Sequence, residues 1–291
     1  MNNAAIPESE LVLHPNGRIY HLNILPEELA DTVLLVGDPD RVDLISRHFD
    51  SVEVKQQLRE FRVHTGYLGK KRLSVVATGI GVSNIDIVMT ELDALANIDL
   101  ETRQVKKNIK TLDIFRIGTC GSLCRTVDVG SVIVTDFAIG LTNLLYFYLR
   151  KEDRDEKALL KAFLKHVGKD NAMILDPVVA RGSRDLIKRF VDDCHVGYTV
   201  TCVGFYGPQG RHIRAPLMYA DFFDSITHFK YLDTPILNFE METASIYGFG
   251  RILNHRCCSL SSVVVNRATQ VVIDHPQEAM ENLICKVLAN I

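Results

Sequence analysis

The chain has 291 residues, of which 47% are hydrophobic and 24% charged, and its formal net charge is −3. This length and apolar content allow one large α/β domain or two smaller ones, while the absence of a basic stripe or polybasic cluster argues against nucleic acid and anionic membranes as partners. No signal peptide or membrane span is apparent, and seven scattered cysteines without zinc spacing indicate reduced thiols, so we expect a cytoplasmic protein.

The first part of the chain is predicted to alternate strands and helices after an irregular lead-in over residues 1–18. Short β-branched apolar runs predict buried strands, and an apolar stripe at helical spacing predicts a helix. After the first strand, a glycine, an aspartate and a proline have the composition of a strand-to-helix junction, whose backbone amides suit an anion. The expected elements are strands at 33–36, 52–58, 61–68 and 72–78, helices after 41 and over 85–96, and a charged surface insertion over 99–111.

Residues 112–122 are the stretch around which the chain is organised. A buried strand is predicted to end near Ile117, where Gly118 and Gly121 allow the backbone to turn sharply and approach a ligand. Arg116 and Thr119 lie where this strand gives way to the loop. The carboxyl ends of strands are where α/β proteins usually bind ligands, and a guanidinium with a hydroxyl and glycine amides suits phosphate. The alternative is a core strand with a glycine turn and a structural ion pair.

The remaining sequence continues the α/β pattern without an internal repeat or a linker, which predicts one domain over residues 1–291. The expected elements are strands at 131–135, 196–203, 236–239 and 259–265, and helices over 156–167, 183–193, 242–253 and from 276 onward. Polar groups follow the strand ends at 37–41, 116–119, 209–211, 240–242 and 266–267. Independent accidents at all these ends are improbable, so we expect them to form one site.

Four motifs, in this order, resemble those of the nucleoside phosphorylase-I family, and in particular its uridine-cleaving members. They are Gly37-Asp38-Pro39-x-Arg41, Phe115-Arg116-Ile117-Gly118-Thr119-x-Gly121, Phe205-Tyr206-x-x-Gln209-x-Arg211 and Glu240-Met241-Glu242. The resemblance implies a single α/β domain in which a central mixed β-sheet forms a distorted barrel flanked by helices. It also implies phosphorolysis of a nucleoside to the free base and α-D-ribose 1-phosphate, with inorganic phosphate as co-substrate and no cofactor.

The same resemblance assigns roles to individual residues. It implies a phosphate site of Gly37, Arg41, Arg59, Arg116 and Thr119, a ribose site of His21, Met241 and Glu242, and a base site of Phe205, Gln209 and Arg211. Arg116, Arg211 and Glu242 would be catalytic, because they meet the charges that develop on phosphate, base and ribose. Arg59 and His21 would reach a neighbour's site, which implies a homodimer or a trimer of dimers. Asn84 stands where some relatives use serine for a monovalent cation, so no metal is inferred.

The base loop favours a pyrimidine nucleoside, namely uridine. The Gln209 amide can donate to O2 and accept from N3–H of uracil, and Arg211 near O4 would stabilise the departing anion. Asn266 stands where purine-cleaving relatives typically carry an acidic aspartate, and it cannot donate a proton in that way. Three alternatives remain: a purine nucleoside phosphorylase, a hydrolytic nucleosidase and a non-catalytic nucleoside-binding protein. Arg41 and Arg116 argue against the nucleosidase, while Cys120, where many relatives have a hydroxyl, weakens one expected hydrogen bond.

Overall fold

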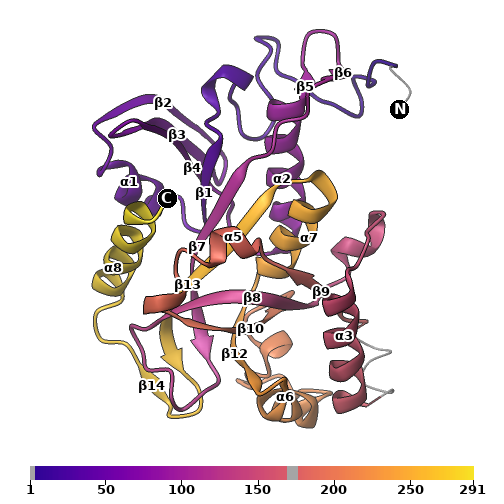
Figure 1. Cartoon of the computed structure of the whole chain (residues 1–291), viewed down its shortest axis with the longest axis vertical. Helices are drawn as coiled ribbons and strands as arrows, with labels where there is room; N and C mark the ends of the chain where they lie inside the picture. The colour runs from indigo at the N-terminus through magenta and orange to yellow at the C-terminus, as the bar shows by residue number, and fades with distance from the viewer. Residues whose placement is uncertain (1–3, 169–175) are drawn as a thin grey trace. The chain divides into compact units, whose positions relative to one another are not determined.

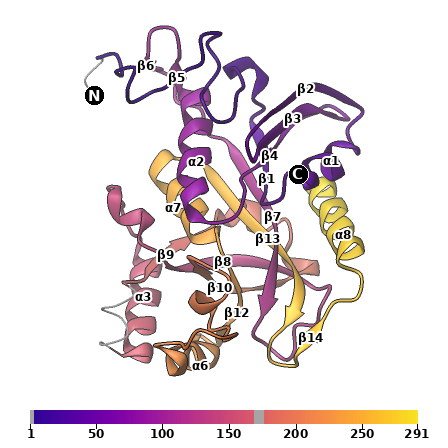
Figure 2. The ribbon, with the colours of Figure 1, turned by 180° about the vertical axis from the view of Figure 1, so that it is seen from behind.

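The computed structural model describes residues 4–168 and 176–291. They separate into two compact units, the first containing Met1–Phe115 and Leu253–Arg256 and the second Arg116–Ile252 and Cys257–Ile291. Figures 1 and 2 show the elements of both units from opposite sides, and each unit is described here by itself. Among the described residues, every helix is too short or too polar to span a bilayer. The single domain expected from the sequence stays a prediction.

The first unit is built on a four-stranded part of the sheet. Its strands are β1 (Thr32–Val36), β2 (Ser51–Leu58), β3 (Phe61–Leu68) and β4 (Lys71–Ala77). β1 pairs with β4 in parallel, and β3 is antiparallel to β4 and to β2. Because β1 and β4 run in the same direction, the turns that follow them open at the same edge: a Cβ on Gly37 would lie 3.6 Å from the Gly79 carbonyl oxygen. This edge holds the first predicted anion site.

Two helices and a small hairpin complete the first unit. Helix α1 (Asp40–Ser46) packs on β3 and β4, and α2 (Val82–Asn97) buries the apolar stripe expected from its sequence. The charged insertion contains an antiparallel pair of short strands, β5 (Ile98–Asp99) and β6 (Gln104–Val105). At the end of α2, Asn97 Oδ1 accepts a hydrogen bond of 2.7 Å from the Lys110 backbone. The insertion is therefore tied to the helix that precedes it.

The second unit contains a closed ring of strands. Its members are β7 (Asp113–Ser122), β8 (Val132–Leu141), β10 (His195–Cys202), β12 (Thr234–Glu240) and β13 (Arg256–Asn266). β8, β10 and β12 are parallel neighbours, β13 lies antiparallel to β8, and β7 lies between β13 and β12. The ring closes where β7 pairs with β12 through Ser122 opposite Asn238 and Gly121 opposite Phe239. The distorted barrel of a mixed sheet is thereby confirmed.

Helices cover the outside of this ring (Figure 1). α3 (Arg154–Val167) and α6 (Ala220–His228) pack together on an apolar cluster that includes side chains of β8, β10 and β12. The other elements of this unit are β9 (Val178–Arg181), α5 (Arg184–Ile187), β11 (Lys230–Tyr231), α7 (Thr243–Leu253), β14 (Val271–Val272) and α8 (Pro276–Ala289). Since β8, β10 and β12 are parallel, their carboxyl ends meet at one edge, and the Gly204–Arg211 and Glu240–Glu242 segments follow two of these ends.

Two expectations about local structure were wrong, and one helix was missed. The chain does not turn at Gly118, because β7 stays extended to Ser122 and pairs there with β12. The helix predicted over 183–193 is broken: only α5 is α-helical, and buried Phe190 leaves the helical region with φ −127° and ψ 0° before a 3-10 turn at Val191–Asp193. Helix α6 was not predicted, although Phe222 and Ile226, four residues apart, are both buried on it.

Candidate active site

Two glycines of strand β7, Gly118 and Gly121, lie beside arginine side chains of the second unit. A Cβ on Gly118 would overlap the guanidinium of Arg116, two residues earlier on the strand. A Cβ on Gly121 would lie 3.4 Å from Arg211 Nη2 and 3.6 Å from Arg267 Cδ. Neither glycine has positive φ. Glycine is therefore required at position 118 for the close approach of the Arg116 guanidinium rather than for a turn, while a methyl group on Gly121 would make ordinary van der Waals contacts.

Arg116 is buried between two carboxylates. Its Nη2 donates to a carboxylate oxygen of Glu242 and lies 3.5 Å from Glu240 Oε2, while Nη1 donates to Ser261 Oγ at 3.5 Å. Burial alone lowers the pKa of Arg116, but Glu242 and Glu240 more than reverse this effect, so its pKa is raised. The guanidinium expected to bind phosphate and the carboxylate expected to bind ribose are thus brought into direct contact.

Glu240 organises the start of α7, where Glu242 lies. Its Oε2 accepts from the backbone nitrogens of Glu242 (2.8 Å) and Thr243 (2.9 Å) and from Thr243 Oγ1 (2.9 Å), and its Oε1 accepts from the Thr201 hydroxyl. Thr243 Oγ1 also lies 2.8 Å from Ser259 Oγ. These buried contacts fix the backbone on which the Glu242 side chain stands. No separate role was predicted for Glu240, since a carboxylate inside a motif does not reveal which atoms it touches.

The residues of the predicted base site, Phe205, Gln209 and Arg211, are also brought together. Arg211 Nη1 donates to the Gln209 amide oxygen and to the Phe205 carbonyl (2.7 Å), and its guanidinium carbon lies 3.9 Å from the Phe205 ring centroid. Arg267 adds a third polar contact, because its Nη1 donates to the Gln209 carbonyl oxygen at 2.6 Å. Burial and, after it, the charge of Arg267 lower the pKa of Arg211. Arg267 had been noticed only as part of a polar strand end, and its contact with this loop was not predictable from spacing.

Asn266, which was expected to distinguish pyrimidine from purine bases, is instead bonded to the backbone. Its Nδ2 donates to the carbonyls of Cys124 and Val127, both at 2.9 Å, and its Oδ1 accepts from the backbone nitrogens of Ala268 (2.9 Å) and Thr269 (3.0 Å). The side chain is 1% exposed. All four bonds hold backbone segments in place, so an amide is required here for loop structure whatever the substrate is.

The other predicted site residues lie in the first unit, apart from half-buried Thr119 and Met241 in the second. Gly37 follows β1, and Arg41 lies in the first turn of α1. Arg59 is exposed at the turn between β2 and β3 with φ +55°, and no carboxylate in the described part of the chain pairs with it. A local ion pair with the adjacent Glu60, which would be the other simple role for Arg59, therefore has no support.

His21 is held firmly by an acid from α2. Its Nδ1 lies 2.6 Å from Glu91 Oε1, and the same carboxylate accepts from the backbone nitrogens of His21 (3.0 Å) and Leu22 (2.8 Å). A histidine that donates through Nδ1 to a carboxylate keeps Nε2 available for another partner. His21 is thereby oriented within its own unit by a residue that sequence spacing did not connect to it.

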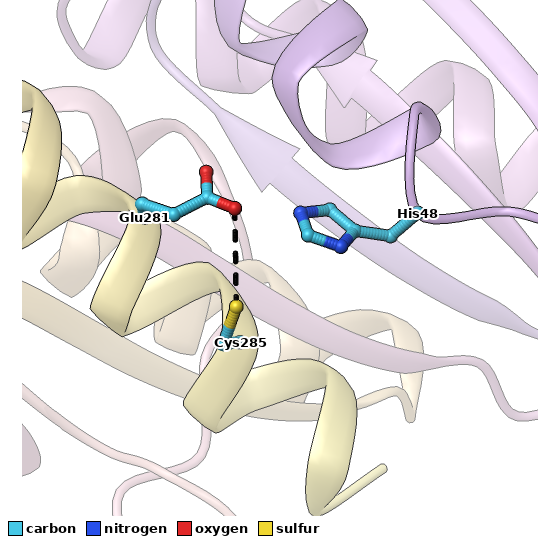
Figure 3. A group of neighbouring side chains, drawn as sticks. All are labelled: His48, Glu281 and Cys285. Atoms are coloured by element: carbon cyan, nitrogen blue, oxygen red, sulfur yellow. Dashed lines mark hydrogen bonds between the residues drawn. The ribbon is translucent and has the colours of Figure 1, made fainter.

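One further group of side chains has the composition of metal ligands. Figure 3 shows Glu281 and Cys285, one turn apart on α8, with Cys285 Sγ donating to Glu281 Oε1 at 3.9 Å. Protein zinc sites use three or four protein ligands. His48, which Figure 3 also draws, belongs to the first unit, so the two residues of α8 support no metal assignment.

Comparisons with known proteins identify the family of the chain. A family model described as the phosphorylase superfamily matches residues 31–289. The chain is 28% identical over 257 residues to a uridine phosphorylase of Thermococcus kodakarensis, covering 87% of this chain and 79% of that one. It is also 28% identical over 244 residues to a DeoD-type purine nucleoside phosphorylase of Myxococcus xanthus, covering 84% and 83%. A solved Trypanosoma brucei nucleoside phosphorylase, described as showing uridine phosphorylase activity, superposes with a TM-score of 0.86 at 26% identity, covering 97% and 100%.

Proposed function

Because the chain belongs to the phosphorylase superfamily, we propose that it cleaves uridine with inorganic phosphate, giving uracil and α-D-ribose 1-phosphate. Breaking the glycosidic bond places positive charge on the ribose and negative charge on the departing base. A site for this reaction needs a cation for phosphate, an anion near the ribose and a donor for the base. Arg116, Glu242 and Arg211 supply these three charges.

When the substrates bind, phosphate would bind Arg116 and the ribose would bind Glu242, so that each replaces one partner in the buried ion pair. The planar guanidinium of Arg116 can donate to two phosphate oxygens and stays charged throughout. The Glu242 carboxylate can accept from the 2′ and 3′ hydroxyls and favours the positive charge that the ribose develops. The family resemblance also assigns Gly37, Arg41 and Thr119 to phosphate, and Met241 to the ribose beside Glu242. No proton donor is required if uracil leaves as an anion.

The choice of uracil is supported by the Gln209–Arg211 pair, which is the observation that carries this proposal. Since Arg211 donates to Gln209 Oε1, the orientation of the amide is fixed, and no acceptor in the described part of the chain is bonded to Gln209 Nε2. That N–H group suits O2 of a pyrimidine. Arg211 remains near enough to stabilise charge at O4, and Phe205 offers a ring for stacking.

A purine substrate is the main rival, because one of the relatives at 28% identity is a purine nucleoside phosphorylase. Asn266 does not distinguish a purine from a pyrimidine, since its amide is engaged by backbone groups. The preference for uridine therefore depends on Gln209 and Arg211. A nucleosidase is disfavoured by the buried Arg116, which hydrolysis with water does not require.

Base release from uridine, thymidine and inosine, each with and without phosphate, tests the proposal. We expect uridine cleavage only with phosphate and faster than inosine cleavage. Arg211→Ala should lower kcat more than it raises KM, because the charge that it meets appears only as the base leaves. Arg214→Ala is the matched control: Arg214 is an exposed arginine three residues further on, and its removal should leave the rates unchanged. Equal rates without phosphate would favour the nucleosidase, and faster inosine cleavage would overturn the choice of base.

A further inference from the structure

We infer that Glu240 is a positioning residue that keeps the Arg116 guanidinium in place when Glu242 turns to the ribose. The inference rests on the proposed function, since it assigns a task to a residue of the same site. It starts from an imbalance of charge: two carboxylates, Glu240 and Glu242, face one guanidinium in a buried part of the second unit. Only Glu242 is proposed to hold the ribose, which leaves the charge of Glu240 without a task in the reaction.

The anchoring of the two carboxylates differs. Glu240 is 4% exposed and accepts hydrogen bonds at both oxygens, from two backbone nitrogens and from the hydroxyls of Thr201 and Thr243. Thr201 is itself held, because its Oγ1 accepts from the backbone nitrogen of Ala244 at 2.9 Å. None of these donors is proposed to contact substrate. Glu240 therefore stays where it is when substrates bind, with an oxygen 3.5 Å from Arg116 Nη2.

The consequence for Arg116 follows from simple electrostatics. When Glu242 accepts hydrogen bonds from the ribose hydroxyls, its interaction with Arg116 is weakened. Glu240 then remains as the fixed negative charge beside the guanidinium. Without the charge of Glu240, the guanidinium would have Glu242 as its carboxylate partner among the described residues. The Arg116–Glu242 pair would then tighten, which would withhold the arginine from phosphate and the carboxylate from ribose.

Glu240→Gln separates charge from shape. A glutamine can accept from the same three donors through its amide oxygen and donate to Thr201 Oγ1 through its amide nitrogen, so the start of α7 is retained while the charge is lost. We expect kcat/KM for uridine to fall about 10- to 100-fold, the range for one lost hydrogen bond to a charged group. If the residue acts through Arg116, the same change in an Arg116→Ala background should alter kcat/KM by less than about threefold.

A purely structural role would not produce this non-additivity. Thr199→Val is the matched control, because Thr199 lies two residues before Thr201 on β10 and bonds to Thr135 (2.6 Å) and Asn238 (2.8 Å) rather than to the site. It should lower Tm and leave the kinetic constants unchanged. Thr201→Val, which removes one donor to Glu240 but keeps its charge, is a second variant should Glu240→Gln fail to fold. Its smaller loss should also disappear with Arg116→Ala.

A measurement without turnover distinguishes this inference from the proposed function. In the Arg116→Ala protein two buried carboxylates are left without their cation, so adding Glu240→Gln should raise Tm, whereas the same change with Arg116 present should lower it. Equal losses of kcat/KM in both backgrounds, or equal shifts of Tm, would overturn the role of Glu240 and leave the phosphorolysis proposal standing. An inactive wild-type protein would overturn the phosphorolysis proposal, while the Tm comparison would still decide the charge pairing.

Discussion

At the scale of single residues, Gly118 matters because of what an added methyl group would meet. The Arg116 guanidinium occupies that space, so Gly118→Ala forces the arginine to move. We expect a loss of stability of about 1–3 kcal/mol, the usual cost of overpacking a buried site. The matched background is Arg116→Ala, in which the space is empty and the alanine should cost almost nothing. Urea unfolding of the four proteins in this cycle measures the coupling, and equal costs in both backgrounds would contradict the contact.

Asn266 gives a second prediction at this scale. In Asn266→Asp, a carboxylate would face the carbonyl oxygens of Cys124 and Val127, which now accept from the amide. The change should destabilise the protein by about 1–3 kcal/mol, because buried acceptors lose their donor. We expect no gain of inosine cleavage, as the side chain holds backbone rather than base. Denaturation curves and inosine turnover check the two parts, and a stable variant that cleaves inosine would restore the original interpretation of this position.

At the scale of elements, His64 on β3 links a strand to helix α1 and makes the first unit sensitive to pH. Its Nδ1 lies 2.8 Å from Ser46 Oγ on α1, and burial lowers its pKa below the usual 6.5. A histidine with a lowered folded-state pKa stays neutral while the unfolded chain takes up a proton. Stability is therefore complete above about pH 6.5 and is lost as the pH falls from there towards the folded-state pKa.

The measurement is Tm between pH 7.5 and 5.5 for wild type and His64→Gln, since glutamine can retain a hydrogen bond to Ser46. The variant should show a shallower decline as the pH falls. His195→Gln, at an exposed histidine at the start of β10, is the control and should follow the wild-type curve. Parallel curves for wild type and His64→Gln would show that another group controls the acid limb.

The sequence predicted correctly those elements whose local hydrophobic pattern agrees with their burial in the fold. α2 and α8 were predictable because their apolar stripes are regular, and β1 because a β-branched run ends at a glycine. β7 was predicted too short, since glycine is typical of turns and the partner strand β12 is more than a hundred residues away. The length of β7 is set by its pairing with this distant strand, and such pairing leaves no local signal in the sequence.

The same distinction applies to the site. The motifs predicted that Arg116, Glu242, Gln209 and Arg211 would be functional, and the structure brings them into two pairs. It could not be predicted that a hydroxyl from β10 holds Glu240, because Thr201 lies 39 residues earlier in the chain. Nor could it be predicted that Glu91 orients His21, because seventy residues separate the two. The partners of a side chain are set by tertiary packing, which spacing along the chain does not encode.

At the scale of the whole molecule, the exposed Arg59 is expected to act in a neighbouring subunit. An Arg59→Ala chain and a Glu242→Ala chain should each be nearly inactive alone. If they are refolded together as dimers, about half of the dimers are mixed, and each mixed dimer has one site free of both changes. About a quarter of all sites should then be active. Activity of the mixture, with subunit exchange verified, is the measurement.

Lys70→Ala supplies the control for this experiment, because Lys70 is an exposed cation in the next hairpin turn of the same unit. That chain should be active alone, and mixing it with Glu242→Ala should give only the average of the two parents. If the Arg59→Ala mixture also stays at the average of its inactive parents, Arg59 acts within its own subunit or has no role in the reaction.

The Arg116–Glu242 ion pair also bears on the order in which ligands arrive. Each of these side chains bonds to the other, so under the proposed function the first ligand to bind must break this contact, and the second ligand then finds its own partner already released. Phosphate and nucleoside should therefore bind synergistically, each increasing the affinity for the other by the same factor, as thermodynamic reciprocity demands. Under the proposed function, each ligand should therefore bind more weakly alone than beside the other, and the nucleoside should be held firmly only while phosphate is available.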